Sequence, residues 1–184
     1  HDPSSIRGIV PTSDVRDQFG RPLKDLRISV TDRCNFRCRY CMPRERFSEN
    51  HTFLPKRAFL SFEEIEKVVR SCMSLGLEKV RITGGEPLLR KDLPRLIEML
   101  SGLGIEIALT TNASLLKKEA KALHSAGLTR VTVSLDALDP ELHRTMSDSN
   151  ISVDSVLEGI DEAIRVGLSP VKINCVVQKG VNEE

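Results

Sequence analysis

Hydrophobic and polar residues alternate in five short segments of the chain, and a period of two is typical of β-strands that bury one face. Between these segments, apolar residues recur at helical spacing in four stretches that begin near Ser61, Asp92, Leu115 and Val153. The first stretch opens on a capping box formed by Ser61 and Glu64. The predicted strands span residues 26–31, 80–83, 105–110, 131–135 and 171–177. Regular strand–helix alternation predicts a parallel sheet with right-handed crossovers.

Two architectures fit this order of elements, an open doubly wound sheet and a barrel. A doubly wound sheet is covered by helices on both faces, so its strands are nearly continuous apolar runs. Here each strand has one apolar face and one polar face, as in Val80 and Ile82 against Arg81 and Thr83. Helices can cover only the apolar face. We therefore expect an α/β fold, a partial (β/α) TIM-type barrel with about five parallel strands and its helices outside.

The composition narrows the class of protein. The chain has 184 residues, of which 40% are hydrophobic and 29% charged, as expected for one globular domain. Lys and Arg total 27 against 26 Asp and Glu, so a general nucleic-acid surface is not supported. No apolar run approaches the roughly 18 residues of a membrane span, and no secretory signal is visible. We expect an N-terminal arm (1–24), a barrel domain (25–184), and a cytoplasmic protein without a membrane partner.

Three of the five cysteines lie within eight residues, as Cys34, Cys38 and Cys41. An odd, clustered set is a poor disulfide framework and favours a reducing compartment. Three thiolates from one loop can hold three corners of a [4Fe-4S] cluster and leave the fourth iron open. Structural zinc usually takes four ligands, so zinc, like the absence of a metal, is the weaker alternative. Cys72 and Cys175 are interpreted as small buried hydrophobic residues.

The cysteine loop follows the first predicted strand, and Gly84-Gly85-Glu86-Pro87 follows the second. Together with Tyr40 before the third cysteine, these motifs resemble the radical S-adenosylmethionine (SAM) superfamily. The match extends to other segments. These resemble the N-terminal portion of proteins of the GTP 3′,8-cyclase family, which is also called molybdenum cofactor biosynthesis protein A. These segments are residues 26–33, 41–43, 81–90, 110–112, 133–136 and 171–174. Ala113 departs from this family, which usually has glycine at that position.

The resemblance implies roles for particular residues. It implies that a [4Fe-4S] cluster is bound by Cys34, Cys38 and Cys41. It implies that SAM, the second cofactor, is contacted by Tyr40, Gly84, Gly85, Glu86 and Ser134. It implies that GTP is contacted by Arg27, Arg81, Thr110 and Lys172. The implied reaction converts GTP to (8S)-3′,8-cyclo-7,8-dihydroguanosine 5′-triphosphate, the first step of molybdenum cofactor biosynthesis, and requires an electron donor.

Some residues keep a structural interpretation as an alternative. Arg27, Arg81 and Lys172 fall on the polar faces of three strands, where they suit a triphosphate or form salt bridges with Glu106 or Asp136. Both His124 and His143 are expected to be surface residues. A basic set near the cysteines is either solvated surface or guides anions and the reductant. That set comprises Arg33, Arg37, Arg39, Arg44 and Arg46.

Two other functions stay open at this point. One is a different radical SAM enzyme that acts on a peptide or cofactor precursor, and the other is a non-catalytic metal-binding or redox module. The resemblance further implies a second cysteine-ligated [4Fe-4S] cluster in a C-terminal region that this sequence does not contain. It also allows a homodimer, a downstream pyranopterin-forming enzyme as partner, and a mitochondrial location in a eukaryote.

Overall fold

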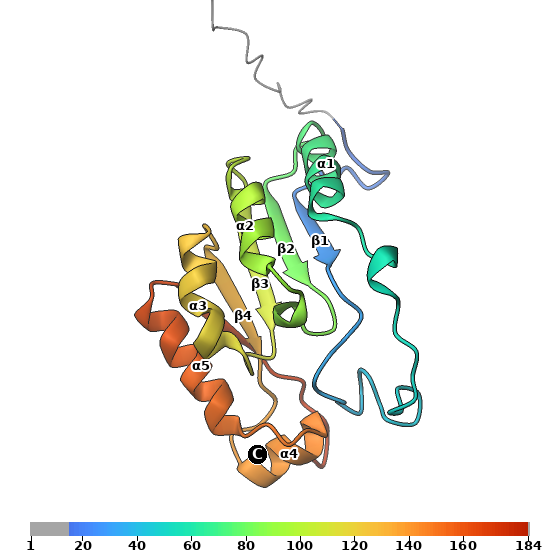
Figure 1. Ribbon diagram of the computed structural model, residues 1–184, viewed down its shortest axis with the longest axis vertical. Helices are drawn as coiled ribbons and strands as arrows, with labels where there is room; N and C mark the ends of the chain where they lie inside the picture. Colours follow the sequence, from blue (N-terminus) through green and yellow to red (C-terminus); the bar gives the residue numbers. More distant parts are fainter. Residues whose placement is uncertain (1–14, 184) are drawn as a thin grey trace, which may run out of the picture.

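The computed structural model describes residues 15–183 and contains one sheet with helices packed against it (Figure 1). The strands are β1 (Asp25–Ser29), β2 (Lys79–Thr83), β3 (Glu106–Thr111), β4 (Arg130–Ser134) and β5 (Val171–Asn174). The helices are α1 (Phe62–Met73), α2 (Leu93–Ser101), α3 (Leu116–Ser125), α4 (Pro140–Ser147) and α5 (Val153–Arg165). Two short 3₁₀ turns lie at Lys56–Ala58 and Pro87–Leu89.

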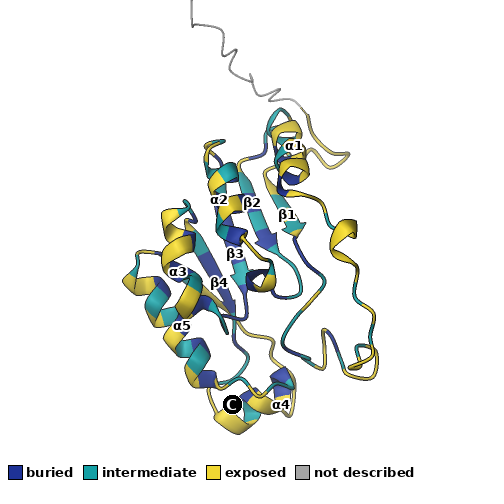
Figure 2. Ribbon diagram, in the orientation of Figure 1, coloured by how far each residue is buried: buried dark blue, intermediate teal, exposed yellow. Residues whose placement is uncertain are grey.

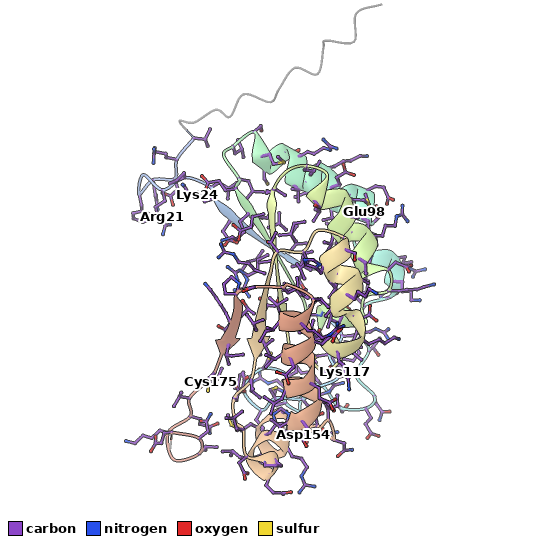
Figure 3. All side chains as sticks on the ribbon, turned by 90° about the vertical axis from the view of Figure 1, so that its left-hand side faces the viewer. Arg21, Lys24, Glu98, Lys117, Asp154 and Cys175 are labelled. Atoms are coloured by element: carbon purple, nitrogen blue, oxygen red, sulfur yellow. The ribbon has the colours of Figure 1, made fainter. Side chains whose placement is uncertain are left out.

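The five strands are parallel and lie in the order of the chain, from β1 to β5. A doubly wound sheet would reverse its strand order part-way, whereas a barrel adds each strand beside the previous one. Helices α1, α2, α3 and α5 cover one face of the sheet, and no described helix covers the other (Figures 1 and 3). The predicted partial barrel is confirmed.

The core lies between the apolar face of the sheet and these four helices (Figure 2). Ile82 and Ile107 of the sheet are fully buried there against helical residues such as Leu96 and Leu123. The capping box at α1 is confirmed, because the Glu64 amide donates to Ser61 Oγ and the Ser61 amide donates to a Glu64 carboxylate oxygen. The polar face of the sheet is consequently left for a site.

Three sequence-based expectations differ from the structure. Cys175 is exposed, because β5 ends at Asn174 and the chain beyond it leaves the helical layer (Figure 3). Cys72 is half-buried rather than fully buried. Helix α4 was not predicted, since its eight residues are too few to show a clear period; Asp139 caps it by accepting a hydrogen bond from the Leu142 amide.

None of the helices in the described part of the chain is long and apolar enough to span a bilayer.

The expected N-terminal arm lies largely outside the described residues. Within residues 15–24, an antiparallel bridge pairs Arg16 with Pro22 and closes a short turn. The division of the chain at residue 25 stays a prediction.

Candidate functional site

A cavity of about 270 Å³ opens at the carboxyl ends of the strands, between the segment after β1 and helix α4. Active sites of parallel barrels are found at this end because the loops after the strands meet there. The cavity brings together most residues that the sequence singled out. Those in its wall are Cys34, Cys38, Tyr40, Cys41, Gly84, Gly85, Glu86, Thr110 and Ser134.

The cysteine loop is a compact turn. The amides of Cys41 and Met42 both donate to the carbonyl of Cys38, at 2.9 Å, and the Phe36 amide donates to Cys34 Sγ at 3.4 Å. Cys34 and Cys38 are half-buried, while Cys41 is exposed. Burial raises the pKa of the Cys34 thiol and raises that of Cys38 to about 12. Both thiols are therefore protonated without a metal, and metal binding must release their protons.

The donor set fits an iron–sulfur cluster better than a single metal ion. Among the described residues, no three His, Cys, Asp or Glu side chains are grouped so as to hold one ion. A [4Fe-4S] cluster instead takes each thiolate on a different iron, so its cysteines need only surround a shared space. All three thiols border the same cavity. Within residues 15–183, the side chains therefore do not form a ready-made site for a single zinc ion.

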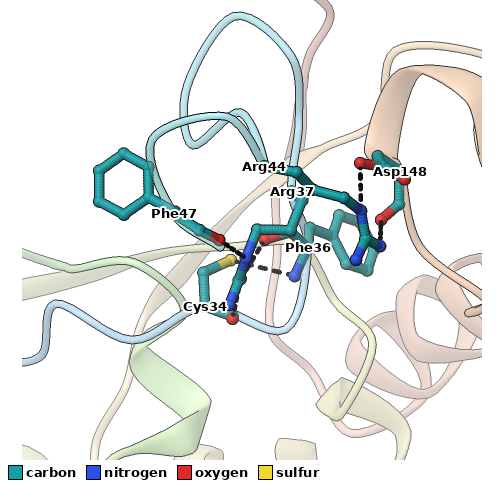
Figure 4. A network of polar contacts seen from close by, with 6 residues as sticks. All are labelled: Cys34, Phe36, Arg37, Arg44, Phe47 and Asp148. Atoms are coloured by element: carbon teal, nitrogen blue, oxygen red, sulfur yellow. Dashed lines mark hydrogen bonds and ion pairs between the residues drawn. The ribbon is translucent and has the colours of Figure 1, made fainter. Parts of the chain in front are cut away.

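Two arginines of the basic set stabilise this loop from outside (Figure 4). Arg37 donates from its guanidinium to the carbonyls of Cys34, Phe36 and Phe47 at 2.7–3.2 Å. Arg44 forms an ion pair with Asp148, just after α4, at 2.6 Å. These two cations have structural roles. The other three members of the set, Arg33, Arg39 and Arg46, are exposed, and the Arg33 guanidinium lies 5.8 Å from the centroid of the Phe53 ring.

The two glycines after β2 allow the cysteine loop to approach the sheet closely. The Gly85 amide donates to the Thr31 carbonyl at 2.8 Å, and the Glu86 amide donates to the Arg33 carbonyl at 2.7 Å. A Cβ on Gly84 would lie 2.7 Å from the Thr31 carbonyl oxygen, and one on Gly85 would overlap the Arg33 carbonyl. Any side chain at these positions would push the loop away.

Glu86 is buried and joins the ends of β2 and β3. One of its carboxylate oxygens accepts hydrogen bonds from Thr111 Oγ1 at 2.7 Å and from the Leu88 amide at 3.0 Å. The other accepts from the Asn112 amide at 2.7 Å. Burial raises the pKa of Glu86, and these three donors oppose the rise by stabilising the carboxylate. Glu86 thus positions the strand ends that form the cavity wall.

Asp136, after β4, links the cysteine loop to the segment after β5. Its carboxylate accepts hydrogen bonds from the Tyr40 hydroxyl at 2.6 Å and from the Val176 amide at 2.9 Å. Its carbonyl accepts from Asn182 Nδ2 at 2.7 Å. Burial, followed by the bond to Asp136, raises the pKa of Tyr40. Asp136 is therefore not the salt-bridge partner of a strand cation.

The polar face of the sheet carries a second zone, next to the cavity and nearer the amino ends of the strands. The strand register pairs Arg27 with Arg81, Arg81 with Ala108, and Thr132 with Lys172, so these side chains share one face. Among the described residues, this face of the sheet carries five cationic side chains and two carboxylates. The cations are Arg27, Lys79, Arg81, Arg130 and Lys172, and the carboxylates are Asp25 and Glu106.

The ion pairs in this cationic zone differ in part from those expected. Arg81 pairs with Asp25 at 3.3 Å, whereas Glu106 pairs with Lys79 at 3.3 Å and with Arg130 at 3.0 Å. Arg27 and Lys172 are exposed and form no ion pair within residues 15–183. The cations therefore exceed the local carboxylates, as a site for an anion requires. Thr110 lies in the cavity wall, in the same row of the sheet as Thr132 and Lys172.

Comparison with known proteins decides the family. The model of the Radical SAM superfamily matches residues 28–184, which includes the cysteine loop, the glycine pair and all strands after the start of β1. The chain belongs to the radical SAM superfamily. Members of this superfamily use SAM and a [4Fe-4S] cluster, and the cavity supplies the three thiols that such a cluster needs.

Curated relatives and solved structures agree with this radical SAM assignment. The chain is 55% identical to "GTP 3′,8-cyclase" of Acidothermus cellulolyticus over 174 residues, which is 94% of the chain and 48% of that protein. It is likewise 55% identical to the protein of that name from Staphylococcus carnosus, over 92% of the chain and 50% of that protein. The chain thus spans about half the length of the curated relatives it matches.

Among solved structures, Streptococcus suis SuiB bound to its precursor peptide SuiA superposes with a TM-score of 0.70. The sequence identity is 25%, and the match covers 85% of this chain and 34% of SuiB. Methylornithine synthase superposes with a TM-score of 0.63 at 18% identity, over 88% of this chain and 46% of that one. The second likeness shows the fold alone.

Sequence reasoning missed a part of the radical SAM cavity wall. His143 was expected at the surface, but it is 4% exposed and lines the cavity with Met146 and Ser147. The error has a physical cause: α4 was not recognised, so its buried face could not be identified. His124, on α3, is exposed as expected. Asn174, at the end of β5, also borders the cavity and lay in a segment already singled out by resemblance.

Proposed function

We propose that the chain is the SAM- and nucleotide-binding half of a GTP 3′,8-cyclase, which converts GTP to (8S)-3′,8-cyclo-7,8-dihydroguanosine 5′-triphosphate. One observation carries this proposal. A thiol-lined cavity and a cationic zone adjoin on one face of the sheet, in a chain 55% identical to proteins of that name. When bound, the cluster and SAM supply the 5′-deoxyadenosyl radical that takes a hydrogen atom from the ribose of GTP.

The residues of the chain place the reactants and exclude water. Cys34, Cys38 and Cys41 hold the cluster in this proposal, and the glycine pair keeps their loop against the sheet. SAM lies in the cavity beside Tyr40 and Ser134. Holding two reactants in fixed geometry removes much of the entropic barrier to their reaction.

The cationic zone is the proposed site of the GTP triphosphate. Guanidinium groups bind phosphate oxygens bidentately, and Arg27 and Lys172 have no competing carboxylate partner among the described residues. Thr110 shares a row of the sheet with Thr132 and Lys172, so it lies between the cavity and the cationic zone. A nucleotide held by the cations could therefore extend its ribose toward the cavity.

Replacing Lys172 or Arg81 with alanine is expected to weaken GTP binding about 10- to 150-fold each, because each change removes a charge-assisted contact worth about 1.5–3 kcal/mol. Isothermal titration of the cluster-loaded chain measures the affinity. Arg95→Ala is the control, since Arg95 lies on the helical face and pairs with Glu63. Equal GTP affinity in Lys172→Ala, Arg81→Ala and Arg95→Ala would exclude the cationic zone as the triphosphate site.

Several wider features belong to the same proposal. An electron donor reduces the cluster, and exposed Arg39 and Arg46 near the cysteines suit an acidic donor. We propose a second [4Fe-4S] cluster in the part of the longer relatives that this chain does not span. A downstream pyranopterin-forming enzyme, a homodimer and a cytoplasmic location complete the proposal.

The likeness to SuiB favours one alternative, a radical SAM enzyme acting on a peptide. Such an enzyme would cleave SAM without any dependence on GTP, and its cationic zone would bind no triphosphate. The GTP titration above therefore distinguishes the two functions. A non-catalytic metal-binding or redox module would bind neither SAM nor GTP.

A further inference from the structure

Two polar atoms in the cavity wall have no hydrogen-bond partner among the described residues, His143 Nε2 and Ser147 Oγ. Both residues are only 4% exposed, and both line the cavity that holds the cysteine loop. They lie four residues apart on α4 and so project from the same face of that helix. Burying a polar group without a partner is costly, so native proteins rarely leave two together.

Other groups of His143 and Ser147, and the neighbouring hydroxyl of α4, already have partners. The Arg37 amide of the cysteine loop donates to the Ser147 carbonyl at 2.9 Å, and the His143 ring packs edge-on against Phe36 with centroids 5.9 Å apart. Thr145, on the exposed side of α4, bonds the carbonyl of Glu141 four residues earlier, whereas Ser147 makes no such bond. Among the described residues, His143 Nε2 and Ser147 Oγ are the only buried side-chain polar atoms of α4 without a partner.

The chemistry of the two atoms limits what could satisfy them. Burial lowers the pKa of His143, so the ring is neutral near pH 7. Because Nε2 has no partner, the hydrogen bond between the ring and the Ile151 backbone is made from Nδ1. Nε2 then carries a lone pair and accepts, while the Ser147 hydroxyl both donates and accepts. A hydroxyl or amino group is complementary to this pair.

We propose that His143 Nε2 and Ser147 Oγ form a subsite for a hydroxyl or amino group of the nucleoside bound in the cavity. This inference rests on the proposed function, in which SAM and GTP occupy the cavity and the adjoining zone. Both molecules carry ribose hydroxyl and amino groups, so the chemistry is common to them. The two titrations below distinguish them.

The first measurement is the thermal stability of the cluster-free chain. Ser147→Ala keeps the helix and is expected to raise the melting temperature by about 2–4 °C, because an unsatisfied polar atom is removed. His143→Phe keeps a ring against Phe36 but also loses the bond from Nδ1 to the Ile151 backbone, so the two effects oppose each other and the melting temperature should change little. Thr111→Val is the matched contrast, since that buried hydroxyl donates to Glu86 and its loss should lower the melting temperature. His124→Phe, at an exposed position of α3, should leave it unchanged.

The second measurement titrates the cluster-loaded chain with SAM and, separately, with GTP. Loss of one hydrogen bond is expected to weaken binding of one of them about fivefold to tenfold in both variants. A fall in melting temperature in Ser147→Ala would overturn the subsite, because it would mean that Ser147 Oγ already has a partner. Unchanged affinity for both ligands would overturn it as well. If the unmodified chain binds neither SAM nor GTP, the proposed function fails first and the subsite with it.

Discussion

A Cys38→Ala chain is expected to fold normally and to lose the iron–sulfur cluster. Formation of 5′-deoxyadenosine from SAM should then fall by more than about 100-fold, since even outer-shell changes at metal sites cost 10–100-fold. Cys38 is one of three thiols around the cavity, and the two other cysteines of the chain, Cys72 and Cys175, do not line it. Iron content, visible absorption and 5′-deoxyadenosine formation measure the effect.

Cys72→Ala is the matched control for this change. Cys72 lies on α1 against the hydrophobic core, so its loss should leave iron content and SAM cleavage unchanged. Retention of a SAM-cleaving cluster in Cys38→Ala would contradict the assignment of the cysteine loop as the metal site.

Gly85→Ala is expected to destabilise the chain by about 2–3 kcal/mol and to reduce cluster loading sharply. The added methyl would overlap the Arg33 carbonyl and lie 3.0 Å from the Cys34 amide nitrogen. The cysteine loop must then retreat from β2, which strains the hydrogen bond from the Gly85 amide to the Thr31 carbonyl. Urea unfolding measures the stability, and iron content per chain measures the loading.

Gly102→Ala provides the control for backbone substitution. Gly102 ends α2 with a φ of −59°, and an added Cβ would come no nearer than 3.4 Å to Met99. Alanine should therefore be tolerated there with a stability change below about 1 kcal/mol. The same free energy of unfolding in Gly85→Ala and Gly102→Ala, with a full cluster in both, would contradict this explanation. It would mean that the close approach of the two backbone segments does not require glycine at position 85.

The fold was largely predictable because two signals in the sequence are strong. Alternation along the strands distinguishes a one-sided sheet from a doubly wound one, and the strand order from β1 to β5 confirms the distinction. The failures concern short or peripheral elements. Helix α4 has too few residues for a period to be seen, and β5 ends at Asn174, so Cys175 lies beyond the strand and is exposed.

The candidate site was predictable where its residues lie close together in the sequence as a motif. The cysteine spacing and the glycine pair identified one cavity wall in advance. Pairings between side chains distant in sequence could not be predicted, because they depend on register: Arg81 meets Asp25 across β1 and β2, and Tyr40 meets Asp136. The glycines also have a role that the motif alone did not indicate. They allow the backbone around Thr31 and Arg33 to pack directly against the segment after β2.

Cys34, Cys38 and Cys41 are expected to hold the cluster of a radical SAM centre in this chain. The most direct measurement is electron paramagnetic resonance of the anaerobically reconstituted, dithionite-reduced chain, recorded before and after SAM is added. We expect four irons and four sulfides per chain and a reduced-cluster signal that changes on SAM binding. Zinc bound in place of iron, or a cluster signal indifferent to SAM, would contradict it.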